Sequence, residues 1–202
     1  MKKTITAIII LLSAISSLKA EEEDIETRIK KKLFSGGMQF HFGYSNISTP
    51  YQTVNNFIFG IGGRAYFNVW DYIRIGLGGA STKTDYSPLF IDDAGMKSYV
   101  DLGYGGVLLE FKFHYKRFLF SAGCMIGGGG YTSLIVLTKS GTTYNTAYSE
   151  GATFIAIPAV NFEFFITESI SATVSFDYFF GSRIVDGSQY GFRGLIGILF
   201  YK

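Results

Sequence analysis

Alternation of apolar residues with polar or small ones is the feature that most constrains the fold of this 202-residue chain. Residues two apart point to the same face of a β-strand, whereas a helix repeats every 3.6 residues. The clearest runs are Met38, Phe40, Phe42 and Tyr44, and then Ile170, Ala172, Val174, Phe176 and Tyr178. The sequence therefore predicts strands with one apolar face and one polar or small face.

Eight such strands are predicted along the chain, and most are longer than the ~5–6 residues of a globular strand. They span about 36–46, 56–69, 72–84, 98–114, 118–132, 151–165, 169–182 and 189–201. A strand that crosses a bilayer obliquely needs ~9–11 residues, which these lengths match. Short connections near Trp70, Lys116 and Glu168 alternate with longer polar ones at 47–55, 85–97, 133–150 and 183–188. Pro158 predicts a bulge within its strand.

An alternating barrel can enclose either of its two faces. A soluble ligand carrier lines its cavity with the apolar face, whereas an outer-membrane barrel turns that face to lipid. From Leu33 to Lys202 there are 22 charged residues in 170, about 13%. A water-exposed surface of this size needs far more charge, because large bare apolar patches aggregate. We therefore expect an all-β, eight-stranded antiparallel up-and-down transmembrane β-barrel.

The charged residues within the predicted strands are expected to fill the lumen of this barrel. They are four bases and four acids: Arg64, Arg74, Asp101, Glu110, Lys112, Glu163, Asp177 and Arg193. Placing Asp101 and Glu110 both inward requires a register shift, which Gly105 and Gly106 can supply. A turn near position 185 brings Asp177 opposite Arg193. Crowded into a narrow lumen, these charges should neutralise one another and block a continuous water path.

The first twenty residues have the pattern of a secretory signal peptide. Lys2 and Lys3 precede an apolar run over 5–12, which small residues follow up to Ala20. We expect cleavage after Ala20, a charged periplasmic segment over 21–35, and a barrel over 36–202 in the bacterial outer membrane. Residues 21–32 hold five acids and four bases, and either a solvated tail or a short amphipathic helix accounts for them.

The last predicted strand alternates apolar residues and ends in aromatic ones, with Phe192, Ile196, Ile198 and Phe200 on one parity. Over residues 36–201 the chain resembles, in architecture, the small eight-stranded bacterial outer-membrane proteins of the OmpX type and the membrane domain of OmpA. In that family a terminal aromatic is read by the barrel-assembly machinery; here Tyr201 and Lys202 follow, and the terminal lysine departs from the pattern. We expect a structural or surface-interaction (adhesion-like) role, with surface loops as the candidate site for an extracellular ligand. An even number of strands puts both termini on one side, and short turns normally face the periplasm, so both termini are expected there.

Composition argues against several other classes of protein. Cys124 has no disulfide partner in the chain, and one cysteine with two histidines is too few for the usual zinc sites. The segment from Leu33 onward has 11 bases and 11 acids, so no nucleic-acid partner is expected. Glycine strings at 60–63 and 127–130 lack the Lys-Ser/Thr of a phosphate loop.

The two histidines, His41 and His114, are the candidate catalytic bases. Ser45 lies about 13 Å along the strand from His41, too far for direct proton transfer. Both histidines are expected toward the periplasmic end. We expect no enzyme, no catalytic residues, no cofactor and no metal. A narrow pore and, behind it, a lipid-modifying enzyme remain the alternatives to a closed barrel with surface loops.

Overall fold

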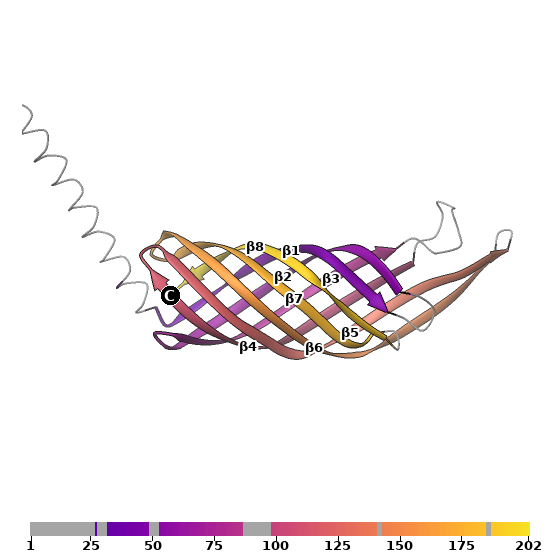
Figure 1. Ribbon diagram of the computed structural model, residues 1–202, viewed down its shortest axis with the longest axis horizontal. Helices are drawn as coiled ribbons and strands as arrows, with labels where there is room; N and C mark the ends of the chain where they lie inside the picture. Colours follow the sequence, from indigo (N-terminus) through magenta and orange to yellow (C-terminus); the bar gives the residue numbers. More distant parts are fainter. Residues whose placement is uncertain (1–26, 28–31, 49–52, 87–97, 141–142, 185–186) are drawn as a thin grey trace, which may run out of the picture.

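Eight antiparallel strands form a closed ring in which β8 pairs with β1 (Figure 1). The computed structural model describes Thr27 and residues 32–48, 53–86, 98–140, 143–184 and 187–202. The predicted signal peptide and most of segment 21–35 lie outside these residues. The strands are β1 (Phe34–Ser48), β2 (Thr53–Trp70), β3 (Ile73–Tyr86), β4 (Ser98–Tyr115), β5 (Phe118–Ser140), β6 (Thr143–Thr167), β7 (Ile170–Ile184) and β8 (Gly187–Tyr201). All eight predicted strands are therefore present.

The first and last strands meet at the same end of the barrel. The amide of Phe34 donates to the carbonyl of Lys202 at 3.1 Å, and the amide of Lys202 donates back at 2.9 Å. Two-residue connections after β2, β4 and β6 separate the strands joined there. One of these residues, Lys116, has a φ of 55°, a conformation that tight hairpin turns require. An even strand number thus places the start of β1 and the end of β8 together.

The hairpin of β5 and β6 extends beyond the rest of the barrel. Pairing of β4 with β5 ends at Tyr99 and Leu134, whereas β5 and β6 stay paired out to Ser140 and Thr143. The expected loop over 133–150 is therefore wrong, because most of it is a two-stranded arm (Figure 1). Such an arm needs strand propensity but no continuous apolar face, so the alternation used to find strands is missing from its sequence.

Pro158 interrupts the ladder between β6 and β7 without shifting it. Paired residues are Ala156 with Phe180 and Ala159 with Asp177, and the register is the same on both sides. The expected bulge at Pro158 is therefore wrong. Proline lacks an N–H and cannot donate to the neighbouring strand, so the ladder opens locally while the strand direction is kept.

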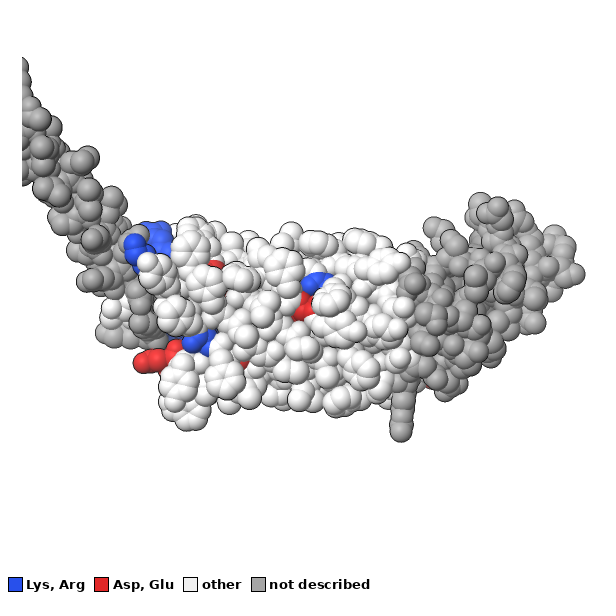
Figure 2. Space-filling view, viewed as in Figure 1, with Lys and Arg blue, Asp and Glu red and all other residues white. Residues whose placement is uncertain are grey.

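The outer surface is apolar around the ring. Among the described residues, 37 large hydrophobic side chains are exposed, including Phe192 at 74% and Leu77 at 66%. Figure 2 shows one side of this surface almost free of charge, with charged atoms at the end near the termini and near the middle. Trp70 and Tyr72 stack at a short turn, with ring centroids 6.4 Å apart. Such a band, flanked by aromatic rings, suits the hydrocarbon of a bilayer. No described helix has the length and hydropathy to cross a membrane.

The enclosed face is only partly polar, contrary to the expected polar lining. Next to buried Ser, Thr and charged residues lies an apolar cluster centred on β4, β5 and β6, to which Phe179 on β7 also belongs. It includes Val100, Leu102, Tyr131, Ile155 and Phe179, each at most 8% exposed. On these strands both faces carry apolar residues, so part of the lumen is packed like the core of a soluble domain.

The assignment of the two faces is tested on β7. Val174 is 43% exposed on the outer face, between buried Thr173 and Ser175. We expect Val174→Arg to lower the free energy of unfolding in lipid vesicles by about 2–4 kcal/mol if the site lies at the bilayer midplane, because the charge enters hydrocarbon. Urea titration of the vesicle-folded protein measures this, with Val174→Leu as the control. Equal stability of the two variants would mean that this face does not contact lipid.

Candidate functional site: the charged lumen

Arg74 is the centre of a buried ion cluster near the short-turn end of the lumen. Its Nη2 lies 2.7 Å from Glu110 Oε2 and 2.7 Å from Glu163 Oε1, so one guanidinium holds carboxylates from β4 and β6. Its Nε donates to Glu110 Oε2 at 2.9 Å. All three side chains are at most 1% exposed. A cation shared between two acids on separate strands ties the ring together across its lumen.

Aromatic hydroxyls complete this cluster. Tyr66 donates to Glu110 Oε1 at 2.8 Å, and the Arg74 guanidinium lies 3.9 Å from the centroid of the Tyr66 ring. Tyr201 donates to Glu163 Oε2. The ring of Tyr66 fits because Gly76 faces it, where a Cβ would lie only 2.8 Å from Tyr66 Cδ1. Each carboxylate therefore accepts from a phenol in addition to its ion pair, which compensates its loss of water.

A second ion pair lies farther along the lumen. Asp177 and Arg193 are cross-strand neighbours on β7 and β8. Arg193 Nε donates to Asp177 Oδ1 at 2.8 Å and Nη2 donates to Oδ2 at 2.9 Å, a two-pronged pair. Arg193 also donates to the Tyr104 hydroxyl and lies 4.8 Å from the centroid of the Phe179 ring. The structure thus brings Asp177 and Arg193 together as the sequence predicts.

Arg64 links the two groups of charges. Its Nη1 lies 4.0 Å from Glu110 Oε1, and its Nη2 lies 3.8 Å from Asp177 Oδ2. Nη1 also donates to Asn161 Oδ1 at 2.9 Å, and Asn161 in turn donates to Ser121 Oγ at 3.0 Å. The side chain is 9% exposed. A network of hydrogen bonds and ion pairs therefore runs from Arg74 to Arg193 through the middle of the barrel.

Lys112 lies at the edge of this network, near the termini. Its Nζ donates to Asn68 Oδ1 at 2.6 Å, and Asn68 Nδ2 donates to the carbonyl of Lys32 at 2.7 Å. Lys112 therefore contacts Asn68 on β2 and is linked through it to the backbone of Lys32. Arg64, Arg74, Glu110 and Glu163 form a compact cluster, and Lys112 lies beside it.

Asp101 does not belong to the lumen, and its predicted inward position is wrong. It is exposed on the outer face, opposite Lys83 on β3 and Thr132 on β5. Pairing of β4 with both neighbours is continuous between Asp101 and Glu110, so Gly105 and Gly106 introduce no shift. Nine residues separate the two acids, and an odd separation puts them on opposite faces. The described lumen therefore holds four bases and three acids rather than four of each.

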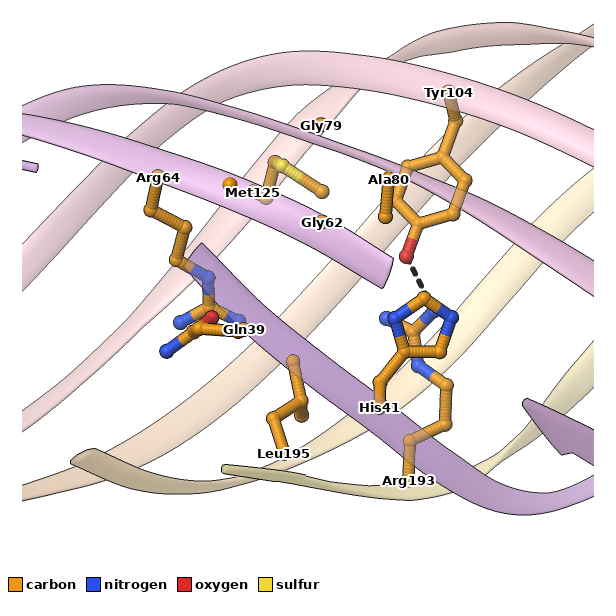
Figure 3. A pocket seen from close by; sticks show the side chains of 11 residues that line it. Gln39, His41, Gly62, Arg64, Gly79, Ala80, Tyr104, Met125, Arg193 and Leu195 are labelled. Carbon is orange, nitrogen blue, oxygen red and sulfur yellow. Dashed lines mark hydrogen bonds between the residues drawn. The ribbon is translucent and has the colours of Figure 1, made fainter. Parts of the chain in front are cut away.

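His41 lies near mid-barrel, where it pairs with Gly60, and not near the short turns as its expected position required. It is buried, and its Nε2 is 2.9 Å from Thr82 Oγ1. Gly60 lies directly against the ring, where any larger residue would collide with it. Figure 3 shows His41 beside Arg193 and across a small cavity from Arg64. That cavity has a volume of about 20 Å³, enough for roughly one water molecule.

The hydroxyl that His41 contacts is that of Thr82 rather than that of Ser45. Ser45 shares the inward face, but its Oγ accepts from Gln189 Nε2 at 2.8 Å. Within the described parts of the chain, no group of three or more His, Cys, Asp or Glu side chains is placed to hold a metal ion. What the arrangement can do is fill the lumen and fix the positions of eight strands.

Residues that sequence reasoning missed are mostly hydroxyl and amide groups. Tyr66, Tyr104 and Tyr201 each contact a lumen charge, as do Ser121 and Asn161. Tyrosine counts as apolar in an alternation pattern, so these rings conceal the polar face. Their parity is the signal that could have found them, because each shares its strand's inward parity.

Comparisons place this architecture among solved structures, although protein-family models and curated proteins give no match. The outer membrane protein OprG from Pseudomonas aeruginosa is 10% identical, with a TM-score of 0.54 over 85% of this chain and 96% of that one. Neisserial surface protein A is 10% identical, with a TM-score of 0.52 over 84% of this chain and 97% of that one. The chain has the fold of the small outer-membrane β-barrels. The expected eight-stranded architecture is thereby confirmed.

The Asp177–Arg193 pair gives a direct test of the network. Asp177→Ala leaves the Arg193 guanidinium buried without its carboxylate partner. We expect this to lower the free energy of unfolding by an amount on the order of 3–5 kcal/mol. We expect the double variant Asp177→Ala with Arg193→Ala to recover part of that loss. Urea unfolding in vesicles gives the coupling energy, with Ser175→Ala as the control. Ser175 faces the same lumen, and its buried Oγ has no hydrogen-bond partner among the described residues. Additive effects of the two single variants would contradict the pair.

Proposed function

We propose that the protein is an integral protein of the bacterial outer membrane, with a closed barrel and a structural or surface-interaction role resembling adhesion. The observation that carries this is the reversed distribution of side chains around a closed ring. Phe192 and Phe176 are 74% and 56% exposed, whereas Arg74 and Glu110 are each 1% exposed. In water, the two phenylalanines would be buried and the two charged residues exposed. The observed distribution is the reverse, so lipid is the surrounding medium that fits.

The filled lumen supports a plug rather than a channel. Arg74, Glu110 and Glu163 occupy one level, and Arg64 continues the network to Asp177. The cavity beside His41 holds about 20 Å³. Ions crossing the barrel would have to displace paired charges that have given up their water, which is costly.

The arm formed by β5 and β6 is the candidate surface for an extracellular ligand. Short turns of such barrels face the periplasm and longer connections face outward. This orientation puts the start of β1 and the end of β8 in the periplasm, and it puts the arm outside the cell (Figure 1). Outer-membrane lipids surround the barrel, and the outward apolar residues of β8, such as Phe200, are suited to the barrel-assembly machinery.

A narrow pore is the alternative function that a single observation favours. The described lumen carries one more base than acid, and Lys112 lies at its edge beside Asn68. Such a positive edge would favour anions if a path existed. A lipid-modifying enzyme is the weaker alternative, because His41 contacts Thr82 rather than a serine nucleophile.

Conductance in planar bilayers separates the plug from the pore. We expect the full chain to show no steady conductance, because the ion-paired network fills the lumen. Arg193→Ala with Asp177→Ala removes one pair and should raise the frequency of brief openings. Val174→Leu, on the lipid-facing side, should behave as the unchanged protein. A steady anion-selective conductance in the unchanged protein would establish the pore.

Location and orientation are tested together with inserted epitope tags. A tag beside Thr143, in the arm, should be reached by antibodies on intact cells. The tagged protein should fractionate with the outer membrane. The matched control is a tag at Lys116, in a short turn, which we expect to be reached only after lysis. A soluble tagged protein contradicts the membrane location, and exchange of the two results contradicts the orientation.

A further inference from the structure

A row of neighbouring residues across four strands leaves the barrel wall thin at one place. Gly123 on β5 pairs with Ala159 on β6, Ala159 pairs with Asp177 on β7, and Asp177 pairs with Arg193 on β8. All four have the inward parity of their strands. Gly123 and Ala159 contribute almost no bulk of their own. The Glu110 side chain covers Gly123 from the lumen, where a Cβ would lie 2.6 Å from Glu110 Cγ, so at these two positions the wall itself is little more than backbone.

The ladder between β6 and β7 opens beside the same row. Pairing is recorded at Ala156 with Phe180 and at Ala159 with Asp177, and it is interrupted at the two intervening positions, of which one is Pro158. The small inward residue Ala159 and the open part of the ladder at Pro158 therefore lie at adjacent positions of β6.

The result is a hollow of about 450 Å³ that opens on the outer surface. Ala122, Pro158 and Phe176 line it from the lipid-facing side, while Ala159 and Asp177 form part of its floor. The Asp177 side chain itself is 0% exposed, so the ion pair closes the hollow toward the lumen. The 20 Å³ cavity in the lumen is far too small to continue it. The hollow is therefore a dead-end pocket in the wall rather than a passage.

We propose that this hollow binds one hydrocarbon chain of a membrane lipid, which fills the break between β6 and β7 on the outer side of the buried Asp177–Arg193 pair. This inference rests on the proposed membrane location. Pro158 lies near the middle of the membrane-crossing part of β6, and exposed Phe154 and Phe162 flank it along the strand. An opening in that band faces lipid tails and no other abundant molecule. An apolar chain is also the occupant that costs no polar group its water.

Lipid retention is the measurement that tests the site. The full chain is folded into vesicles of phosphatidylethanolamine and phosphatidylglycerol, extracted in mild detergent, and weighed by native mass spectrometry. We expect one phospholipid to stay with each barrel after the loosely held lipids are removed. Ala122→Phe places a ring in the hollow from the lipid side and should reduce this retention at least tenfold. Ala122→Leu fills less of the space and serves if the larger residue hinders folding.

The control and a second readout separate the site from general lipid contact. Ala172→Phe changes an outward alanine on β7 that does not line the hollow, and it should retain lipid as the unchanged protein does. In lipid-free detergent Ala122→Phe should unfold at a higher temperature than the unchanged protein, and in vesicles this difference should vanish. A retained lipid with no such temperature difference would place the lipid elsewhere and overturn the site.

Three further results would overturn the inference. They are no retained lipid in the unchanged protein, equal retention in Ala122→Phe, and a change of conductance in Ala122→Phe, which would make the hollow part of a passage. Failure of the proposed function gives a different result. The chain would then not insert into vesicles, and its migration on gels would be the same before and after heating. Insertion without a retained lipid rejects the lipid site alone.

Discussion

Backbone hydrogen bonding in hydrocarbon is the constraint on which the rest of this structure depends. A strand that crosses a bilayer has no water to pair with its N–H and C=O groups, and each unpaired group costs several kcal/mol. Closing the ring from β1 to β8 removes both free edges at once. Closure with eight strands also fixes the width of the lumen, which leaves room for side chains and little else. The charges inside are therefore a consequence of the closed wall.

Inside so narrow a lumen, an isolated charge would be prohibitively costly, so the charges occur as a connected network. Arg74 contacts both Glu110 and Glu163, and Arg64 spans the distance from Glu110 to Asp177. Replacing such a network with apolar residues of equal volume is often neutral for stability, so stability alone does not explain it. What paired charges add is geometry, because each guanidinium accepts only certain positions of the strands that carry its partners.

The sequence predicted the outer face better than the inner one, and particular residues show why. On β1 and over residues 171–177 of β7 the inward positions are Ser, Thr, Gln, His, Asp and Gly, so alternation identified both faces. On β4 the inward positions include Val100, Leu102 and Leu108, and the outward ones include Gly103 and Asp101. Polarity is inverted there over several residues, which is why Asp101 was assigned to the lumen. Pairing register, which only the folded chain shows, settles its position. The inward position of the tyrosines in the ion network was not predicted for a related reason, because tyrosine counts as an apolar residue in an alternation pattern.

Filling the lumen and sealing the wall place opposite demands on the inward residues. Large charged side chains need small neighbours. Gly43 pairs with Arg193, and Gly123 lies against the Glu110 side chain. Small neighbours leave the wall thin, and this is tolerable where the backbone ladder is intact. At Pro158 the ladder is open as well, so there the Asp177–Arg193 pair separates the outer hollow from the lumen. The surrounding lipid is the component with the right chemistry to fill that hollow. In this view the barrel is complete only in its membrane, because part of its wall is supplied by the solvent in which it folds.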